Sequence, residues 1–114
     1  MDVDSLKKEL GSVFIELKAG FKSIEELVSK DAYFSIPKNT RHLLFVSLRD
    51  KVNLILDVFL QAQYFDSDEL KNSVSNLNKG FKIFSEAVVN EKKEEILVSL
   101  DNLGAVVSGL IKSF

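Results

Sequence analysis

The sequence predicts an all-α protein, an antiparallel up-down-up-down four-helix bundle that forms one domain over residues 1–114. Apolar residues recur every three or four positions along almost the whole chain, which is the spacing of a helix face that lies against a core. No stretch of two-residue alternation indicates a strand. Three segments rich in polar or turn-forming residues (29–40, 66–69 and 90–95) separate four helical stretches of similar length. Short connections make neighbouring helices antiparallel, so these observations favour the bundle.

The first helix is expected at about residues 4–29. Its apolar stripe is wide enough to face a core and contains Val3, Leu6, Leu10, Val13, Leu17, Ile24 and Leu27. The connector at 29–40 contains the only proline, Pro37, which disfavours helix at the residue before it. Its apolar residues are Tyr33, Phe34 and Ile36. They are too apolar for an exposed linker, so we expect them to fold back over one end of the bundle.

The second helix, at about residues 39–64, is apolar over most of its circumference: twelve of the eighteen residues from Leu43 to Leu60 are large and apolar. At 100° per residue, one side forms the seam to the core, and it contains Phe45, Leu48, Val52, Ile55 and Phe59. Further apolar residues lie around Asp50 on the opposite side or between the two sides: Leu43, Val46, Leu54 and Val58. Isolated exposed leucines, or cover from the connector, would explain them. We favour a second interpretation, in which these four residues contact another protein chain, most simply a second copy across a two-fold axis.

The third helix is expected at about residues 67–89, with Asp66 as its N-cap and Glu69 completing a capping box. Its core seam consists of Leu70, Val74, Leu77, Phe81, Phe84 and Val88. Small residues one heptad apart lie beside that seam and predict close approach of a neighbouring helix: Ser73, Gly80 and Ala87.

The fourth helix is expected at about residues 91–113, with Asn90 as its cap. Glutamates in its first turn suit the positive end of the helix dipole. Its seam consists of Ile96, Leu100, Leu103, Val107, Leu110 and Phe114. A stripe of small residues, Gly104, Ala105, Ser108 and Gly109, is interpreted as a place of close helix packing.

The overall composition favours a soluble cytoplasmic protein. The chain has no cysteine, which excludes disulfides and thiolate metal sites. The net charge of −2 and a pI of about 5.4 give no electrostatic reason to expect nucleic acid or an anionic membrane as partner. The N-terminal MDVDSLKKEL does not resemble a secretory signal. No apolar run approaches the roughly 18–20 residues of a membrane-spanning helix.

No arrangement of residues indicates catalysis, a cofactor or a metal. The expected core seams carry no Asp, Glu or His, and Glu-x-x-His, which di-metal bundles use, does not occur. The only histidine, His42, stands at the start of the second helix, and no G-x-S-x-G elbow accompanies it. The five glycines match no phosphate-binding motif. A non-enzymatic protein is therefore expected.

The two arginines provide one candidate for an anion site. Lys38, Arg41 and Arg49 share one flank of the second helix, and a guanidinium binds carboxylate or phosphate in bidentate fashion. Alternatively, Arg41 closes the end of the bundle while its stem covers Phe45 and Tyr33. We favour this structural interpretation.

The function expected from the sequence is protein–protein contact, as a homodimer or as an accessory subunit of an intracellular complex. One alternative is nucleic-acid binding through the basic flank of the second helix, extended by Lys51, with an affinity that falls steeply with salt. The other alternative is an apolar small-molecule carrier whose cavity would be lined by Phe45, Phe59, Phe81 and Phe84, although phenylalanines on a seam usually form the core.

Overall fold

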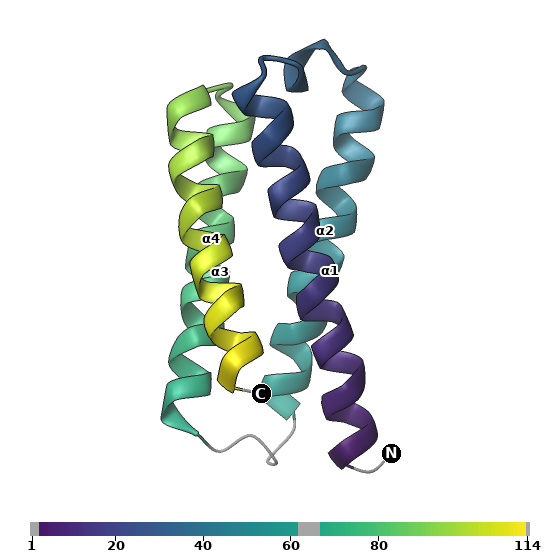
Figure 1. Ribbon diagram of the computed structural model, residues 1–114, viewed down its shortest axis with the longest axis vertical. Coiled ribbons are helices and arrows are strands. Elements are labelled where there is room, and N and C mark those ends of the chain that lie inside the picture. The colour runs from purple at the N-terminus through teal and green to yellow at the C-terminus, as the bar shows by residue number, and fades with distance from the viewer. Residues whose placement is uncertain (1–2, 62–66, 114) are drawn as a thin grey trace.

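The computed structural model of this chain describes residues 3–61 and 67–113 and consists of helices joined by short connections (Figure 1). The elements are α1 (Val3–Ser29), the short 3-10 helix η1 (Tyr33–Ser35), α2 (Lys38–Gln61), α3 (Asp68–Val89) and α4 (Lys93–Ser113). No strand occurs among the described residues. The helix boundaries agree with the predicted ranges to within three residues, except that the predicted end of the second helix, residues 62–64, lies outside the described residues.

The four helices form a compact bundle of about 44 × 22 × 20 Å in which successive helices run in opposite directions (Figure 1). Each helix contacts its neighbours in sequence, and α4 returns to pack against α1, which closes the ring. The η1 connector and the α3–α4 connection lie at one end, whereas α1 begins and α4 finishes at the other (Figure 1). The predicted all-α four-helix bundle is thereby confirmed.

Two predicted caps are wrong. The N-cap of α3 is Ser67, whose side chain accepts a hydrogen bond from the Leu70 N–H at 3.4 Å; Asp66 lies outside the described residues. Asn90 is the C-cap of α3 and not the N-cap of α4, because its N–H donates to the carbonyl of Glu86. The next two residues complete the turn, so that α4 begins only at Lys93.

Two acidic residues adopt the left-handed conformation at helix ends: Asp31 after α1 (φ 56°) and Glu91 after α3 (φ 53°). In both turns this residue's N–H donates to the carbonyl three positions earlier, and the following N–H donates to the carbonyl five positions earlier. This is the Schellman motif, in which glycine is the usual left-handed residue. Both carboxylates form ion pairs across this end of the bundle: Asp31 with Lys93 at 2.6 Å, and Glu91 with Arg41 at 3.9 Å.

The core runs along the bundle axis and contains residues from all four helices. Phe21, Phe81 and Phe84 form its aromatic part, with ring centroids 5.7–6.4 Å apart. From the connector, Tyr33 is buried as expected, whereas Phe34 is 37% exposed. Among the described side chains of α2, only Leu48, Val52 and Ile55 are fully buried. Because α4 packs more extensively against both α1 and α3 than α2 does against its own neighbours, α2 is the most weakly packed helix.

The surroundings of the glycines confirm close helix packing at Gly80 and contradict it at the small-residue stripe of α4. A Cβ added at Gly80 would lie 2.9 Å from Cδ2 of Leu103, so this glycine admits a core leucine of α4. A Cβ at Gly104 or Gly109 would meet nothing within 4 Å. Close packing at the small-residue stripe of α4 is therefore the wrong interpretation. Three residues of the stripe, Gly104, Ala105 and Ser108, instead border a surface groove between α1 and α4 that is also lined by Phe21 and Lys22.

Among the described residues, α4 is the one helix that is long and apolar enough to cross a membrane by length and composition alone. The expectation that no segment would be long and apolar enough to span a membrane therefore does not hold for α4. The core helix of a soluble bundle meets the same criterion, and Ile96, Leu100, Leu103, Val107 and Leu110 of α4 are buried against α1 and α3.

We expect the same substitution to have opposite effects at two glycines. Gly104→Ala should raise the free energy of unfolding by about 0.5–1 kcal/mol, because alanine favours helix and its methyl group meets open space. Gly80→Ala should lower it, since overpacking against Leu103 costs about 1–3 kcal/mol and exceeds that gain. Urea unfolding of both variants checks the pair. Equal stabilisation by both would contradict the close approach at Gly80.

Candidate functional site

A pocket of about 520 Å³ lies at the end of the bundle where α2 begins. The walls come from η1, from the first two turns of α2, from the end of α3 and from Glu91 of the α3–α4 connection. The lining residues are Tyr33, Lys38, Arg41, His42, Phe45, Ser85, Val88, Val89 and Glu91. We call this feature the Tyr33 pocket. It combines an apolar wall with three basic residues and one carboxylate.

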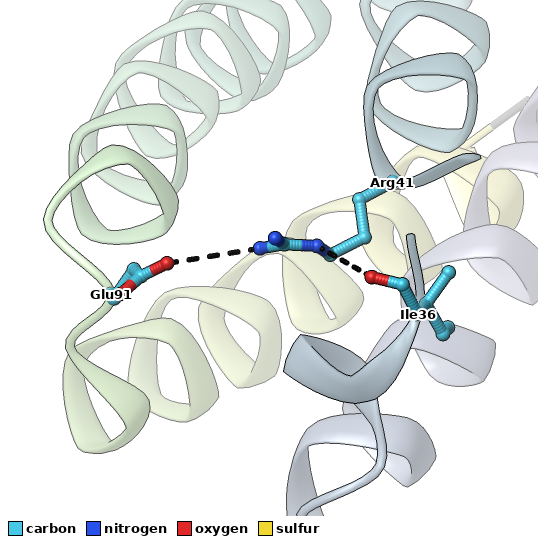
Figure 2. Close-up of polar contacts among 3 residues, drawn as sticks. All are labelled: Ile36, Arg41 and Glu91. Atoms are coloured by element: carbon cyan, nitrogen blue, oxygen red, sulfur yellow. Dashed lines mark hydrogen bonds and ion pairs between the residues drawn. The ribbon is translucent and has the colours of Figure 1, made fainter. Parts of the chain in front are cut away.

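Arg41 joins three parts of the chain beside the Tyr33 pocket (Figure 2). Its Nε donates to the carbonyl of Ile36 at 3.1 Å, and its Nη1 lies 3.9 Å from Oε1 of Glu91. The guanidinium also lies over the rings of Phe34 and Tyr33, at 5.2 and 5.9 Å from their centroids. Arg41 thus links the connector and the α3–α4 connection at this end of the bundle, with its guanidinium rather than its stem over Tyr33, and with Phe34 as the second ring. The separation from Glu91 exceeds hydrogen-bond length, so the Nη groups keep donor capacity for a closer acceptor.

Tyr33 carries a buried hydroxyl that has no partner among the described residues. Its side chain is only 1% exposed. Burial raises the pKa of Tyr33 above its ordinary value of 10.0, while the positive charge of Arg41 acts in the opposite direction. The hydroxyl is therefore neutral at physiological pH and able to donate. A buried hydroxyl without a partner costs about 1–3 kcal/mol, which makes this group unusual in a folded protein.

The predicted anion-binding residues are only partly brought together. Lys38 and Arg41 both line the Tyr33 pocket, but Arg49 does not, and its Nε lies 3.8 Å from the carboxylate of Asp50. His42 lines the pocket as well, although the sequence interpretation treated it as a residue of the helix start. The sequence did offer a signal for grouping His42 with these residues, because it lies one helical turn after Lys38 and next to Arg41. The positive end of the α2 dipole adds to this basic cluster.

Lys51, the fourth residue of the nucleic-acid alternative, lies apart from the others. Its Nζ donates to Oγ of Ser47 at 2.9 Å, and it lines a different groove of about 300 Å³ between α1 and α2. Lys38 and Arg41 are thus the only two of these four basic residues among those that line the Tyr33 pocket. A continuous basic track along α2 has no support from this arrangement.

Two of the four predicted interface residues are exposed to solvent on the outer face of α2. Leu43 is 69% exposed and Leu54 is 47% exposed, three helical turns apart on the same face. Val46 is half-buried, and Val58 packs against the core. The groove between α1 and α2 runs beside this face and is lined by Leu27, Leu44 and Leu48 among others. Leu44 is itself 38% exposed, so the apolar surface continues from the outer face into the groove.

The phenylalanines considered for an internal cavity form packed core instead. Phe81 and Phe84 are buried, and Phe45 stacks against both at centroid distances of 5.4 and 6.2 Å. Phe59 is partly buried against the same core. Phe45 also borders the Tyr33 pocket. Within residues 3–61 and 67–113, no group of three or more His, Asp and Glu side chains could hold a metal ion.

Replacing Tyr33 by phenylalanine should stabilise the protein at neutral pH by about 1 kcal/mol, because it removes an unsatisfied buried hydroxyl and keeps the ring. Burial raises the pKa of Tyr33 in the folded state, so above pH 10 the unfolded chain loses this proton first. The wild type should then lose stability relative to Tyr33→Phe as the pH rises past 10. Thermal unfolding from pH 7 to 11 tests both effects; a destabilised Tyr33→Phe at pH 7 would show that the hydroxyl has a partner.

Glu91→Gly should be more stable than Glu91→Ala by about 1 kcal/mol, since only glycine occupies the left-handed conformation without steric cost. Both variants lose the contact with Arg41, so the difference between them isolates the backbone conformation. Urea unfolding of both variants measures this difference in the free energy of unfolding. The opposite order of stability would mean that residue 91 does not hold a positive φ in solution.

Comparisons of this chain with protein-family models, with curated proteins and with solved structures found no match. The Tyr33 pocket and the outer face of α2 are the two features of the described residues at which the candidate functional side chains come together.

Proposed function

We propose that this chain is a non-enzymatic protein that acts through protein–protein contact, and that the outer face of α2 docks onto a second copy of the chain. The observation that carries the proposal is the exposure of Leu43 and Leu54 on the helix that packs most weakly against the rest of the bundle. Burial of apolar surface would drive the association, at about 25 cal/mol per Å². The alternative role, an accessory subunit of a larger complex, would use the same face.

The order of residues on this face suits a two-fold axis. An antiparallel pairing of two α2 helices, centred between Leu48 and Arg49, would place Leu43 of each copy against Leu54 of the other. The same pairing would bring Ser47 opposite the second copy's Asp50. The Ser47 hydroxyl already accepts from Lys51, so its proton is free to be donated to that carboxylate. A parallel pairing would instead oppose like charges, Asp50 against Asp50.

The outer face of α2 alone is too small for a stable interface, which typically removes about 800 Å² per partner from water. The adjoining groove provides the rest in this proposal. Leu44 continues the apolar surface towards Leu27 of α1. Polar groups of the groove, Glu16 and Lys51, have opposite charges and could pair across the axis. An interface formed by α2 and the adjacent edge of α1 is therefore expected.

Light scattering behind a sizing column should give twice the chain mass of 12.8 kDa for the wild type at micromolar concentration. Leu54→Glu should give the monomer mass, because it places a charge in the apolar contact. Its far-UV circular dichroism should remain that of the wild type, since Leu54 is 47% exposed and lies outside the core.

Ile83→Glu is the matched control. Ile83 is a similarly exposed aliphatic residue on α3, 59% accessible, and lies outside the proposed interface. It should leave the dimer intact. A monomeric wild type would contradict self-association, and loss of the dimer in both variants would place the contact elsewhere than on α2.

A further inference from the structure

The geometry points to the Tyr33 pocket as a binding site for an amphipathic organic anion, a carboxylate or phosphate monoester attached to an apolar body. This inference is independent of self-association, because Leu43 and Leu54 do not line the pocket. Three features of the pocket support it: an excess of positive charge, an unpartnered buried hydroxyl and an apolar wall. Each specifies one part of the ligand.

The charge of the pocket favours an anionic group. Lys38 and Arg41 lie at the start of α2, where the helix dipole is positive and where the first turn holds no acidic residue. Among the described residues that line the pocket, Glu91 alone carries a carboxylate, which is exposed and lies 3.9 Å from Arg41. A ligand carboxylate or phosphate could approach to hydrogen-bond distance, about 2.7–2.9 Å for a charge-assisted contact, and take the place of this long ion pair.

The hydroxyl of Tyr33 provides a second, independent indication. It is buried, lacks a partner among the described residues and belongs to a side chain of the pocket lining. Burial raises the pKa of Tyr33, so the group is a donor at neutral pH. The oxygen itself is sealed from solvent, with less than 1 Å² accessible, so a ligand oxygen accepts from it only if the side chains that cover it shift on binding. That contact would then remove the cost of leaving the hydroxyl unsatisfied.

The apolar wall distinguishes this site from one for an inorganic ion. Phe45 is held in place by stacking on Phe81, with an interplanar angle of 23°. Val88 lies beside it on α3 and packs against the core. A volume of about 520 Å³ lies within the range of small-molecule sites, roughly 300–1,000 Å³. Phosphate or sulfate alone would leave this wall in contact with water, whereas an aromatic or aliphatic body would cover it.

Four probes with one apolar body and different head groups test the inference: naphthalene-2-carboxylate, 2-naphthyl phosphate, 2-naphthylmethanol and 2-naphthylmethylamine. Titration of the full chain, followed by naphthyl fluorescence, should show the two anions binding at least about tenfold more tightly than the alcohol, since charge-assisted contacts exceed neutral ones. The amine should bind most weakly. Inorganic phosphate at the same concentration should not displace the carboxylate.

Matched variants locate the site. Lys38→Gln should weaken the binding of naphthalene-2-carboxylate about fivefold and leave the affinity for the alcohol unchanged. Arg49→Gln, which removes an equal charge outside the pocket, should change neither affinity. Tyr33→Phe should bind the carboxylate more weakly while unfolding at a higher temperature, a combination that loss of structure cannot produce.

Equal affinity for all four probes, or no saturable binding of the anions at millimolar concentration, would overturn the inference. Equal effects of Lys38→Gln and Arg49→Gln would also overturn it, because they would show nonspecific attraction to a charged surface. An unchanged affinity for the carboxylate in Tyr33→Phe would count against the inference, because it would show that the hydroxyl does not contact the ligand. A monomeric wild type that still discriminates among the probes would contradict the proposed dimer and leave this site standing.

Discussion

The burial of α4 against both α1 and α3 is the constraint on which the rest of the structure depends. From Ile96 to Leu110 the seam residues of α4 are buried, mainly against these two neighbours, and Gly80 lets Leu103 approach the backbone of α3 closely. This arrangement buries the apolar faces of α1, α3 and α4, whereas α2 packs against α1 and α3 with the smallest buried face. The excess apolar residues of α2 therefore stay at its flanks and outer face. Both proposed sites involve this helix, because its core contacts occupy only part of its circumference. The outer face belongs to α2, and the Tyr33 pocket lies between its first two turns, η1 and the end of α3.

Near η1, polar contacts attach α2, the most weakly packed helix, to the rest of the bundle. Arg41 links α2 to the connector through Ile36 and to the α3–α4 connection through Glu91. Asp31 and Lys93 make a second link between α1 and α4. Both acidic residues sit in a strained left-handed conformation, which costs roughly 1–2 kcal/mol each. Exposed ion pairs seldom recover that much. The Schellman hydrogen bonds at both turns, which satisfy carbonyls of the preceding helix, offset part of this cost.

The helices were predictable from the sequence because apolar spacing over twenty or more residues reports directly on the buried face. The core seam of α2 followed from the same geometry: Leu48, Val52 and Ile55 are buried as predicted. Cap assignments at Asn90 and Ser67 were not predictable, since several neighbouring residues can cap a helix and the turn geometry decides among them. The Tyr33 pocket joins residues more than fifty positions apart, from η1 to Glu91. Periodicity along one helix cannot show which residues of another helix face it. The sequence therefore did not place His42 in this pocket, and Arg49, grouped with Lys38 and Arg41 by its position on the helix, does not line it.

The location of both proposed sites on α2 has a thermodynamic consequence. A weakly packed helix is where local opening costs least free energy, because few apolar contacts are lost on opening. Any ligand that binds the closed helix and not the opened one stabilises the closed state by RT ln(1 + L/Kd), where L is the free ligand concentration and Kd its dissociation constant. An anion bridging Lys38 and Arg41 would hold the first turns of α2 against η1 and α3, whereas a second copy would hold its outer face. If both bind the same closed state, each raises the other's apparent affinity by the same factor, since linkage between binding sites is reciprocal. The size of that factor is limited by the free energy of opening α2, so strong coupling requires a helix that is substantially open when neither partner is bound.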